Sequence, residues 1–476
     1  MDEISQSKEE QHQQGVVNMR LHGTAFLDHF SSALSKTSSQ PNSCSFSGTV
    51  TETSINDQQE VLDNQVAALS PPQPPDGGLQ GWLVVLGSYL SLFATFGIVN
   101  AYGVFQDYYQ STMLSEYSNS VISLIGTTQL FLLYGLGLLV GQWFDIYGTR
   151  LLIPVGSFLT VFSLMMLSIC QKNQIYQFFI TQGILFGLGN ALLFTPALAV
   201  IGQWFDKRRA YAIGIVASGS SLGGVVFPIM LHQLLSRVGF GWAVRIMAFF
   251  VLGCLSISIL TVKSRLPSQC PKSLIQLIDF GGFRDVRYTL AVIGAFLIFY
   301  SVFIPYFYIQ IFADFEGVSA NYTASLLPVL NGLGILARVL PGFLADHYGC
   351  LNILVPTTFI SASLIFVLWL PSRTAPAVIA FSALYGLFSG GFISLLPAYI
   401  AKISPIEKYG ARLGMVYAFA SIANLIGPPT AGTLIKSVDQ TSFNHLIIFT
   451  GIVQLFGSVV WIIVRYKCSP RLLVLI

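Results

Sequence analysis

The sequence predicts an all-α polytopic membrane protein with twelve transmembrane helices, arranged as two similar six-helix halves. Hydrophobic residues make up 53% of its 476 residues and charged residues only 9%, against roughly 25% charged in soluble domains. From Trp82 onward, apolar runs of about 20 residues recur, which is the length that a helix needs to cross the hydrocarbon of a membrane. A motif of the first half also returns about 200 residues later in the second half.

The elements follow from this pattern in chain order. Residues 1–78 are polar, end in a Pro- and Gly-rich run, and predict a disordered cytoplasmic tail without a cleavable signal peptide. The first half, residues 79–262, is expected to hold spans near 82–105, 120–141, 150–170, 176–202, 210–235 and 242–262. A charged cytoplasmic linker is expected at 263–287. The second half, 288–465, and a short cytoplasmic tail, 466–476, follow, with spans near 288–312, 323–343, 351–370, 376–401, 412–436 and 444–464.

Lysine and arginine residues gather in alternate connections between the spans, which predicts the orientation of the chain. If the N-terminal tail is cytoplasmic, the connections on that side hold fifteen of these residues, whereas the opposite side holds four. Both termini are therefore expected in the cytoplasm. The plasma membrane is the expected location, with the vacuolar membrane as the alternative.

The short turn between the second and third spans carries a motif of small and charged residues. Its members are Gly141, Asp145, Gly148 and Arg150, and the first three recur at an offset of 201 as Gly342, Asp346 and Gly349. Small residues let helices approach closely, and an aspartate at a helix end can make a charge contact that differs between two states. The repetition favours a gating role, and the alternative is an interfacial turn with solvated charges.

A second motif precedes and enters the fifth span. Its basic turn and small residues are Lys207, Arg208, Arg209, Gly214 and Gly219. Gly214 and Pro228 are matched by Gly414 and Pro428, at an offset of 200. A helix with such a surface packs backbone to backbone, so it is either a gating helix or an element of static packing.

These motifs carry a resemblance to a known family. The Gly141–Arg150 turn resembles the signature of the major facilitator superfamily, over residues 76–465. The segments Asp76–Trp82 and Trp204–Ser220 resemble the two hallmark motifs of the monocarboxylate porter family, particularly its fungal branch. The resemblance implies a transporter in which two six-helix halves rock against each other.

Two arginines lie within predicted spans, where a charge is costly and is by default a functional candidate. Arg245 lies near the outer end of the sixth span and is expected to snorkel to the interface. Arg338 lies deeper, in the eighth span, and matches the family's substrate-binding arginine. No Asp or Glu falls in the core of a predicted span, so a carboxylate or enolate of the substrate is the expected counter-ion. The alternative is that Arg338 reaches Asp346 or water.

The resemblance is incomplete around Arg338. Lactate carriers of the family have an aspartate four residues before the arginine and a lysine in the first span, and these positions here are Gly334 and Asn100. Both charges are missing together, as expected if a buried pair is tolerated intact or absent but not halved. The binding chemistry is therefore expected to differ from that of the lactate carriers.

Uncharged polar residues inside the spans are further candidates for substrate binding. Asn100 and Asn331 rank first because they lie at or near the family's binding positions, and Tyr102 joins them; the alternative for each is a hydrogen bond between helices. Proton coupling stays open, because His232 and His445 lie near predicted outer helix ends, where a solvated or packed histidine is the simpler interpretation.

The sequence thus predicts a secondary active or facilitative transporter of a small organic anion or carboxylated metabolite. Export of a secondary metabolite and uptake are both open, and the alternative class is a non-transporting sensor on a transporter scaffold. An ATP-driven pump or an intramembrane enzyme is not expected, since Walker A and HExxH motifs are missing. The cysteine spacing and the charge pattern predict no metal, cofactor or nucleic acid. The expected partners are a small-molecule substrate and the lipid bilayer, the oligomeric state stays open, and Asn321 begins a weak glycosylation sequon close to the membrane.

Overall fold

The computed structural model describes residues 75–205, 208–265, 279–404, 409–435 and 439–469, apart from the side chains of Asp145, Arg209, Ala210 and Asp346. Nearly all of the predicted tail 1–78, much of the linker 263–287 and the last residues of the tail 466–476 lie outside the described part. Within that part the chain forms helices and no β-strand.

The helices of the first half run back and forth along one axis. In chain order they are α3 (Gly78–Asn100), α4 (Tyr102–Tyr108), the π-helix η1 (Tyr109–Met113), α5 (Asn119–Gly135), α6 (Gly137–Leu167), α7 (Ile175–Phe178), the π-helix η2 (Phe179–Leu185), α8 (Phe186–Ala199), α9 (Ile201–Trp204) and α10 (Arg209–Thr261).

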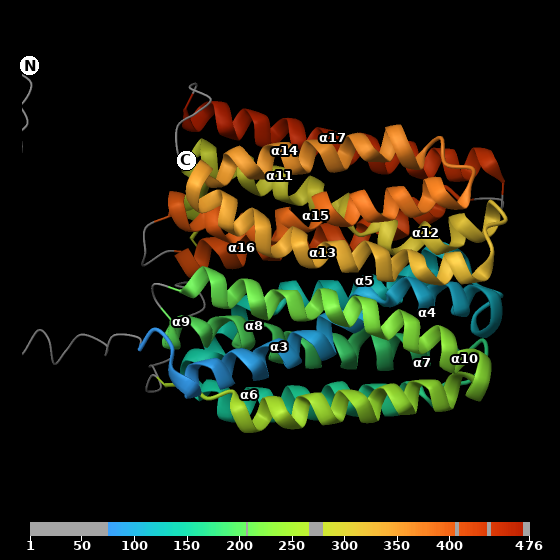
Figure 1. Cartoon of the computed structure of the whole chain (residues 1–476), viewed down its shortest axis with the longest axis horizontal. Coiled ribbons are helices and arrows are strands. Elements are labelled where there is room, and N and C mark those ends of the chain that lie inside the picture. The colour runs from blue at the N-terminus through green and yellow to red at the C-terminus, as the bar shows by residue number, and fades with distance from the viewer. Residues whose placement is uncertain (1–74, 206–207, 266–278, 405–408, 436–438, 470–476) are drawn as a thin grey trace, which may run out of the picture. The chain divides into compact units, whose positions relative to one another are not determined.

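The second half follows the same plan. After the 3-10 turn η4 (Phe280–Arg284), its helices are α11 (Val286–Val302), α12 (Ile304–Phe315), α13 (Ala320–Tyr348), α14 (Cys350–Leu364), the π-helix η5 (Ile365–Trp369), α15 (Ala375–Ile403), α16 (Tyr409–Thr433) and α17 (Gln440–Cys468). The start of α3 and the end of α17 lie at one end of the bundle, which we call the terminal end (Figure 1). The loop 114–118 lies at the opposite end, called the distal end (Figure 1).

The described helices account for the twelve predicted spans. Nine segments are long and apolar enough to cross a membrane, and the pair Asn119–Gly135 and Gly137–Phe144, bent by 44°, adds one more. Tyr211–Thr261, with 51 residues, counts twice because Gly239 breaks it with a φ of 74°, and an unbroken helix would measure about 77 Å. The 25-residue α16 supplies the twelfth span.

Backbone breaks recur at the same offset as the sequence motifs. Gly148 and Gly349 both adopt positive φ, 63° and 91°, a conformation that favours glycine. The first span of each half is also broken, at Ala101 and at Phe303, 202 residues apart. Pro305 accounts for the second break, since it lacks an N–H for the helix. The first span was predicted to end near residue 105, but its helix continues to Met113, so that boundary was wrong.

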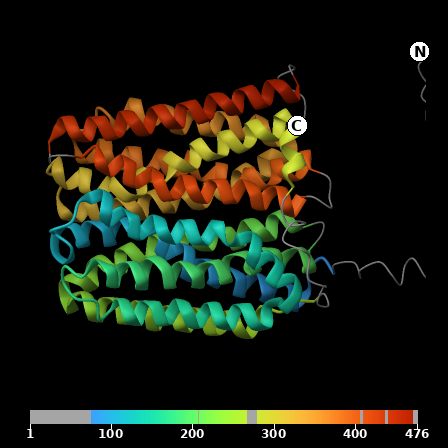
Figure 2. The ribbon, with the colours of Figure 1, turned by 180° about the vertical axis from the view of Figure 1, so that it is seen from behind.

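The two halves meet along few helices. Figure 1 shows α3–α10 in one bundle and α11–α17 in the other, and the reverse side in Figure 2 shows the same division. Across the boundary, α10 packs against α13, α5 against α16, and α4 against α12. Large apolar side chains face outward in both halves, among them Phe158 on α6 (65% exposed) and Phe456 on α17 (63% exposed). Lipid hydrocarbon is the environment that such a surface requires.

Candidate functional site

Arg338 lies on α13 and faces α10 of the first half. Its side chain is 6% exposed, and Nη1 donates hydrogen bonds to the Ala217 carbonyl at 3.1 Å and to the Ser220 hydroxyl. The Ser220 hydroxyl in turn donates to the Ala217 carbonyl, so its oxygen is left to accept from the arginine. Because both acceptors belong to α10, Arg338 joins the two halves.

The other edge of the Arg338 guanidinium has no protein partner among the described residues. Neither Nε nor Nη2 donates to a described atom, and Nε is fully buried. The ion pairs within the described ranges are Arg287–Asp285, Arg373–Glu316 and Arg412–Asp279. Two parallel N–H groups on one edge match the two oxygens of a carboxylate. The alternative partner Asp346 has its side chain outside the described part, so that contact stays a prediction.

Asn100 and Asn331 flank the same segment of α10. Asn100, at the end of α3, donates to the Ser220 carbonyl at 3.2 Å. Asn331 packs flat against Gly224, where a Cβ atom would lie 2.4 Å from the asparagine Cγ. Both side chains are 1% exposed, and in both the Oδ1 atom has no hydrogen-bond donor among the described residues. The structure therefore brings Asn100, Asn331 and Arg338 to one face of α10.

Gly334 lies one turn before Arg338, where the lactate carriers have an aspartate. A Cβ at this position would lie 3.3 Å from the Ser221 hydroxyl, which is closer than ordinary van der Waals contact. An aspartate would therefore crowd α10. The glycine allows α13 to approach this helix and leaves Arg338 without a neighbouring carboxylate from its own turn.

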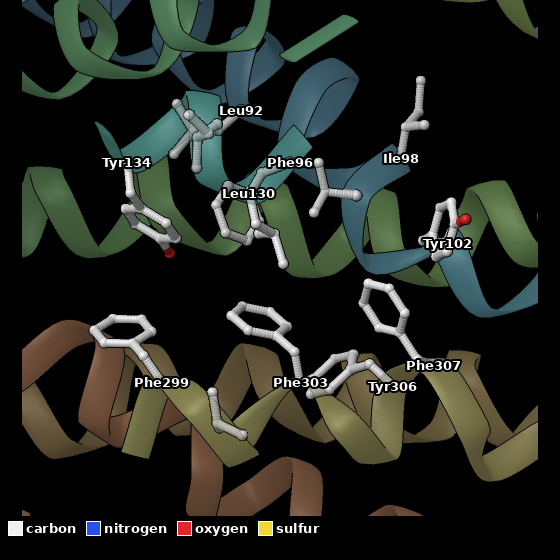
Figure 3. Packing of buried hydrophobic residues seen from close by; sticks show 14 of the residues in the cluster. Leu92, Phe96, Ile98, Tyr102, Leu130, Tyr134, Phe299, Phe303, Tyr306 and Phe307 are labelled. Atoms are coloured by element: carbon white, nitrogen blue, oxygen red, sulfur yellow. The ribbon is translucent and has the colours of Figure 1, made fainter. Parts of the chain in front are cut away.

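Tyr102 does not join this group. Its hydroxyl donates to the Ile122 carbonyl at 2.7 Å, and its ring packs on Gly126. The ring also lies 4.8 Å from that of Phe307, between centroids, and Figure 3 shows these two rings facing each other across the boundary. Tyr102 thus contributes to contact between the halves on the distal side of the site, and its role in substrate binding stays a prediction.

The Gly141–Arg150 turn lies at the terminal end and is bound by the start of the linker. The Ser264 N–H donates to the Thr149 hydroxyl at 2.9 Å, and a cavity of about 310 Å³ lies beside them, bordered by Arg150 and Lys263. Gly141 and Gly342 do not make close helix contacts: a Cβ at Gly141 would find only Thr195 at 4.0 Å, and one at Gly342 nothing within 4 Å. The side chains of Asp145 and Asp346 lie outside the described part, so their gating role stays a prediction.

The two glycines of the second motif have different surroundings. A Cβ at Gly219 would lie 2.4 Å from the Tyr89 carbonyl of α3, whereas one at Gly214 would meet nothing within 4 Å. Gly219 therefore holds α10 against α3 within one half. Arg208 is exposed and precedes α10, Lys207 lies outside the described residues, and of Arg209 only the backbone is described.

Sequence reasoning did not single out Ser220 or Tyr134 as residues that interact with Arg338. Ser220 belongs to a recognised motif, but nothing in the motif indicates that it accepts from an arginine of the other half. Tyr306 on α12 and Tyr134 on α5 interact electrostatically with Arg338, and no signal in the sequence separates Tyr134 from the other 19 tyrosines. The longer first and seventh spans also bring in Asp107 and Asp314, which interact electrostatically at the distal end.

The remaining predicted positions lie at the distal end. Asn321 is exposed in the first turn of α13. His232 and His445 are exposed as well, so neither lies near the Arg338 site. Arg245 is half-buried, donates to the Ser168 hydroxyl at 3.1 Å and stacks on Trp242 at 5.2 Å. Its snorkelling to the membrane interface stays a prediction.

Comparisons with known proteins agree with this architecture. The Major Facilitator Superfamily model matches residues 81–374 and 335–473. The chain is 41% identical to MFS transporter asaE of Aspergillus flavus, over 82% of this chain and 87% of that protein. It is 39% identical to MFS-type transporter opdF of Penicillium oxalicum, over 88% and 98%. It is 42% identical to the aspyridones efflux protein apdF of Emericella nidulans, over 81% and 77%.

These relatives are named as transporters, which favours transport over the sensor alternative. The family match spans both halves and both sides of the Arg338 site. The chain is therefore a multi-pass membrane transporter of small molecules that belongs to the major facilitator superfamily.

Proposed function

We propose that the chain exports an acidic organic metabolite by alternating access and that Arg338 binds the negative charge of this solute. One observation carries the proposal: a buried guanidinium at the boundary of the two halves with its Nε–Nη2 edge free of described protein partners. A buried charge is costly unless it is paired, and a carboxylate or enolate of the solute supplies the pairing. Ser220 and Ala217 hold the opposite edge, so the free edge has a fixed direction.

The direction of transport is the part of the proposal that rests on the relatives. A rocking mechanism is reversible, and direction follows the gradients of the solutes. One relative at 42% identity is named as an efflux protein for aspyridones, which supports export rather than uptake for this chain. We place the carrier in the plasma membrane with both termini in the cytoplasm, as the distribution of Lys and Arg favours.

The finer resemblance supports a carrier of the monocarboxylate porter type with altered binding chemistry. In place of the charged pair of the lactate carriers, the chain has Gly334, which packs near Ser221, and Asn100, which bonds the Ser220 carbonyl. Both replacements favour close packing of α3 and α13 on α10. Arg338 is then the charge that selects the solute, with Asn100 and Asn331 as neutral polar neighbours.

Alternating access assigns the moving bodies to residues 79–262 and 288–465. The contacts that must change are those between α10 and α13 and between α5 and α16. The motif residues Asp145, Arg150 and Asp346 at the terminal end, together with the basic turn of Lys207, Arg208 and Arg209, are proposed to gate this movement.

Export from cells tests the proposal. Yeast cells expressing the chain, its Arg338→Gln variant or its Arg245→Gln variant are loaded with labelled organic acids, and efflux is followed at two external pH values. We expect export of at least one acid by the chain and by Arg245→Gln, and none by Arg338→Gln at equal surface expression. Export that persists in Arg338→Gln would rule out the binding role, and the pH comparison reports proton coupling.

A further inference from the structure

A second buried donor without a described partner belongs to the half of the transporter opposite Arg338. Tyr134 on α5 is 2% exposed, and its hydroxyl has no hydrogen-bond partner among the described residues. Like Tyr306 of α12, it interacts electrostatically with Arg338, which belongs to the other half. Buried donors are nearly always paired in proteins. The tyrosine hydroxyl and Nε of the arginine are thus two buried donors, one neutral and one charged, without an acceptor among the described residues.

Aromatic rings from both halves surround Tyr134. In its own half, its ring lies 6.4 Å from Phe96 and 6.2 Å from Phe194. In the other half, it stacks on Tyr417 at 5.3 Å and 24° and lies 5.4 Å from Phe299. Figure 3 shows the hydroxyl of Tyr134 directed towards the second half, where Phe299 faces it. The rings that cross the boundary are the ones that part when the halves separate.

We infer that Tyr134 and Arg338 form a two-donor site that selects planar conjugated acids over saturated acids of the same size. This inference rests on the proposed function and adds the class of the solute. The negative charge accepts from Arg338 and from the Tyr134 hydroxyl, while the flat π-system of the solute takes the place that Tyr417 or Phe299 occupies against the Tyr134 ring. Offset stacking stabilises contacts between flat aromatic rings beyond the area they bury, whereas a saturated ring has no π-system to stack.

The hydroxyl and the ring of Tyr134 have separable roles at this site. The hydroxyl contributes to the affinity for any anion at the site, because a hydrogen bond to a charged group is stronger than a neutral one. The ring contributes to the choice between flat and saturated solutes. Tyr308 supplies the matched control, since its buried hydroxyl donates to the Pro428 carbonyl at 2.9 Å and it has no described contact with Arg338.

Equilibrium binding to the purified full chain in lipid nanodiscs tests the inference. The probes are 2-naphthoate and its fully saturated counterpart, decahydro-2-naphthoate, which share a carbon skeleton and a carboxylate. We expect naphthoate to bind more tightly, on the order of fivefold. Tyr134→Phe should weaken both acids about tenfold and keep this ratio. Tyr134→Leu should bring the ratio close to one, and Tyr308→Phe should leave both affinities unchanged.

The outcomes separate this inference from the proposed function. Equal affinity for the two acids, or a ratio that survives in Tyr134→Leu, would overturn the inference, and the proposed function would stand if Arg338→Gln abolishes binding of both. Full binding of both acids by Arg338→Gln would overturn the proposed function and the inference together. Absence of saturable binding of either acid would also overturn the inference. If Tyr134→Leu does not fold, Tyr134→Phe still tests the role of the hydroxyl, because it keeps the aromatic ring.

Discussion

Arg338 on α13 donates a hydrogen bond to Ser220 on α10, and this bond joins the two halves of the transporter. Asn100 of α3 donates to the carbonyl of the same serine. Three helices thus converge on one residue, two from the first half and one from the second. Since the bond uses Nη1, it fixes the guanidinium and leaves its opposite edge to an anion.

Replacing Ser220 tests whether this bond positions the arginine. Ser220→Ala should lower the affinity for an organic anion about tenfold, because a hydrogen bond to a charged group contributes about 1.5–3 kcal/mol. The Ala217 carbonyl still accepts from Nη1, so folding should be retained. The neighbouring Ser221→Ala is the control, since the Ser221 hydroxyl is buried without a described partner. Equal affinities in the two variants, measured by titration, would contradict the positioning role.

The movement of the halves can be arrested by a disulfide. A Cβ at Gly414 on α16 would lie 3.4 Å from the Cβ of Leu138 on α6, close to the separation that a disulfide spans. In a background without native cysteines, oxidised Leu138→Cys/Gly414→Cys should stop transport, and reduction should restore it.

A cross-link within one half provides the control for this experiment. Thr128 on α5 and Gly183 on η2 both belong to the first half, and a Cβ at Gly183 would lie 3.5 Å from that of Thr128. Thr128→Cys/Gly183→Cys should cross-link equally well and continue to transport. Undiminished transport by the fully oxidised Leu138/Gly414 pair would be incompatible with rocking halves.

Two glycines of the second motif should respond differently to alanine. Gly219→Ala is expected to destabilise the protein by about 1–3 kcal/mol, because the added Cβ would lie 2.4 Å from the Tyr89 carbonyl. Gly214→Ala meets no atom within 4 Å and should be neutral or stabilising by up to about 1 kcal/mol, since alanine is the better helix former. Thermal unfolding of the purified variants measures both. Similar unfolding temperatures for the two variants would contradict the packing described for α3 and α10.

A buried ion pair connects the end of the linker to α16. Asp279 accepts from Arg412 Nε at 2.9 Å, and the two side chains are 11% and 10% exposed. Arg412 also donates to the Ile403 carbonyl at 3.2 Å and lies over the Tyr288 ring. Asp279→Asn should therefore cost roughly 3 kcal/mol, because the arginine loses its counter-charge while it remains buried.

The exposed pair Asp285–Arg287 is the matched control for this ion pair. Asp285→Asn should change stability by less than about 1 kcal/mol, because its side chain and that of Arg287 are 26% and 47% exposed. The hydrogen bond from Arg287 lowers the pKa of Asp285, so this small contribution is present at neutral pH and is lost only as the pH falls into the acidic range. Unfolding at neutral pH compares the two variants, and equal losses would contradict the difference in burial.

The span pattern was predictable because it depends on local composition. The twelve spans, the gaps at 141–150 and 235–242 that contain Gly148 and Gly239, and the repeat near 200 residues follow from apolar length and from the recurring motifs. The breaks at Ala101 and Phe303 were not predicted, since both lie inside continuous apolar runs. The continuation of the first span to Met113 was missed because polar residues at a helix end resemble a loop.

The site was predictable only in part. Arg338 stands out because a charge within a span is rare, and Asn100 and Asn331 were placed by the family resemblance. The partners of Arg338 depend on which faces of α5, α10 and α13 meet. Helix faces that are apolar all round do not reveal their partners. Tyr102 and Tyr134 illustrate this limit: both are buried tyrosines of the first half, but only Tyr134 interacts with Arg338.

The initial rate of anion uptake into proteoliposomes that contain the purified chain measures directly whether Arg338 binds the transported anion. The compared forms are the unmodified chain, Arg338→Lys, Arg338→Gln and Arg245→Gln. We predict that Arg338→Gln loses saturable transport and that Arg245→Gln transports normally. Arg338→Lys should keep a reduced rate, because a lysine cannot donate two parallel hydrogen bonds to a carboxylate. Saturable transport of the anion by Arg338→Gln at the unmodified rate would contradict the assignment of Arg338 as the anion-binding group.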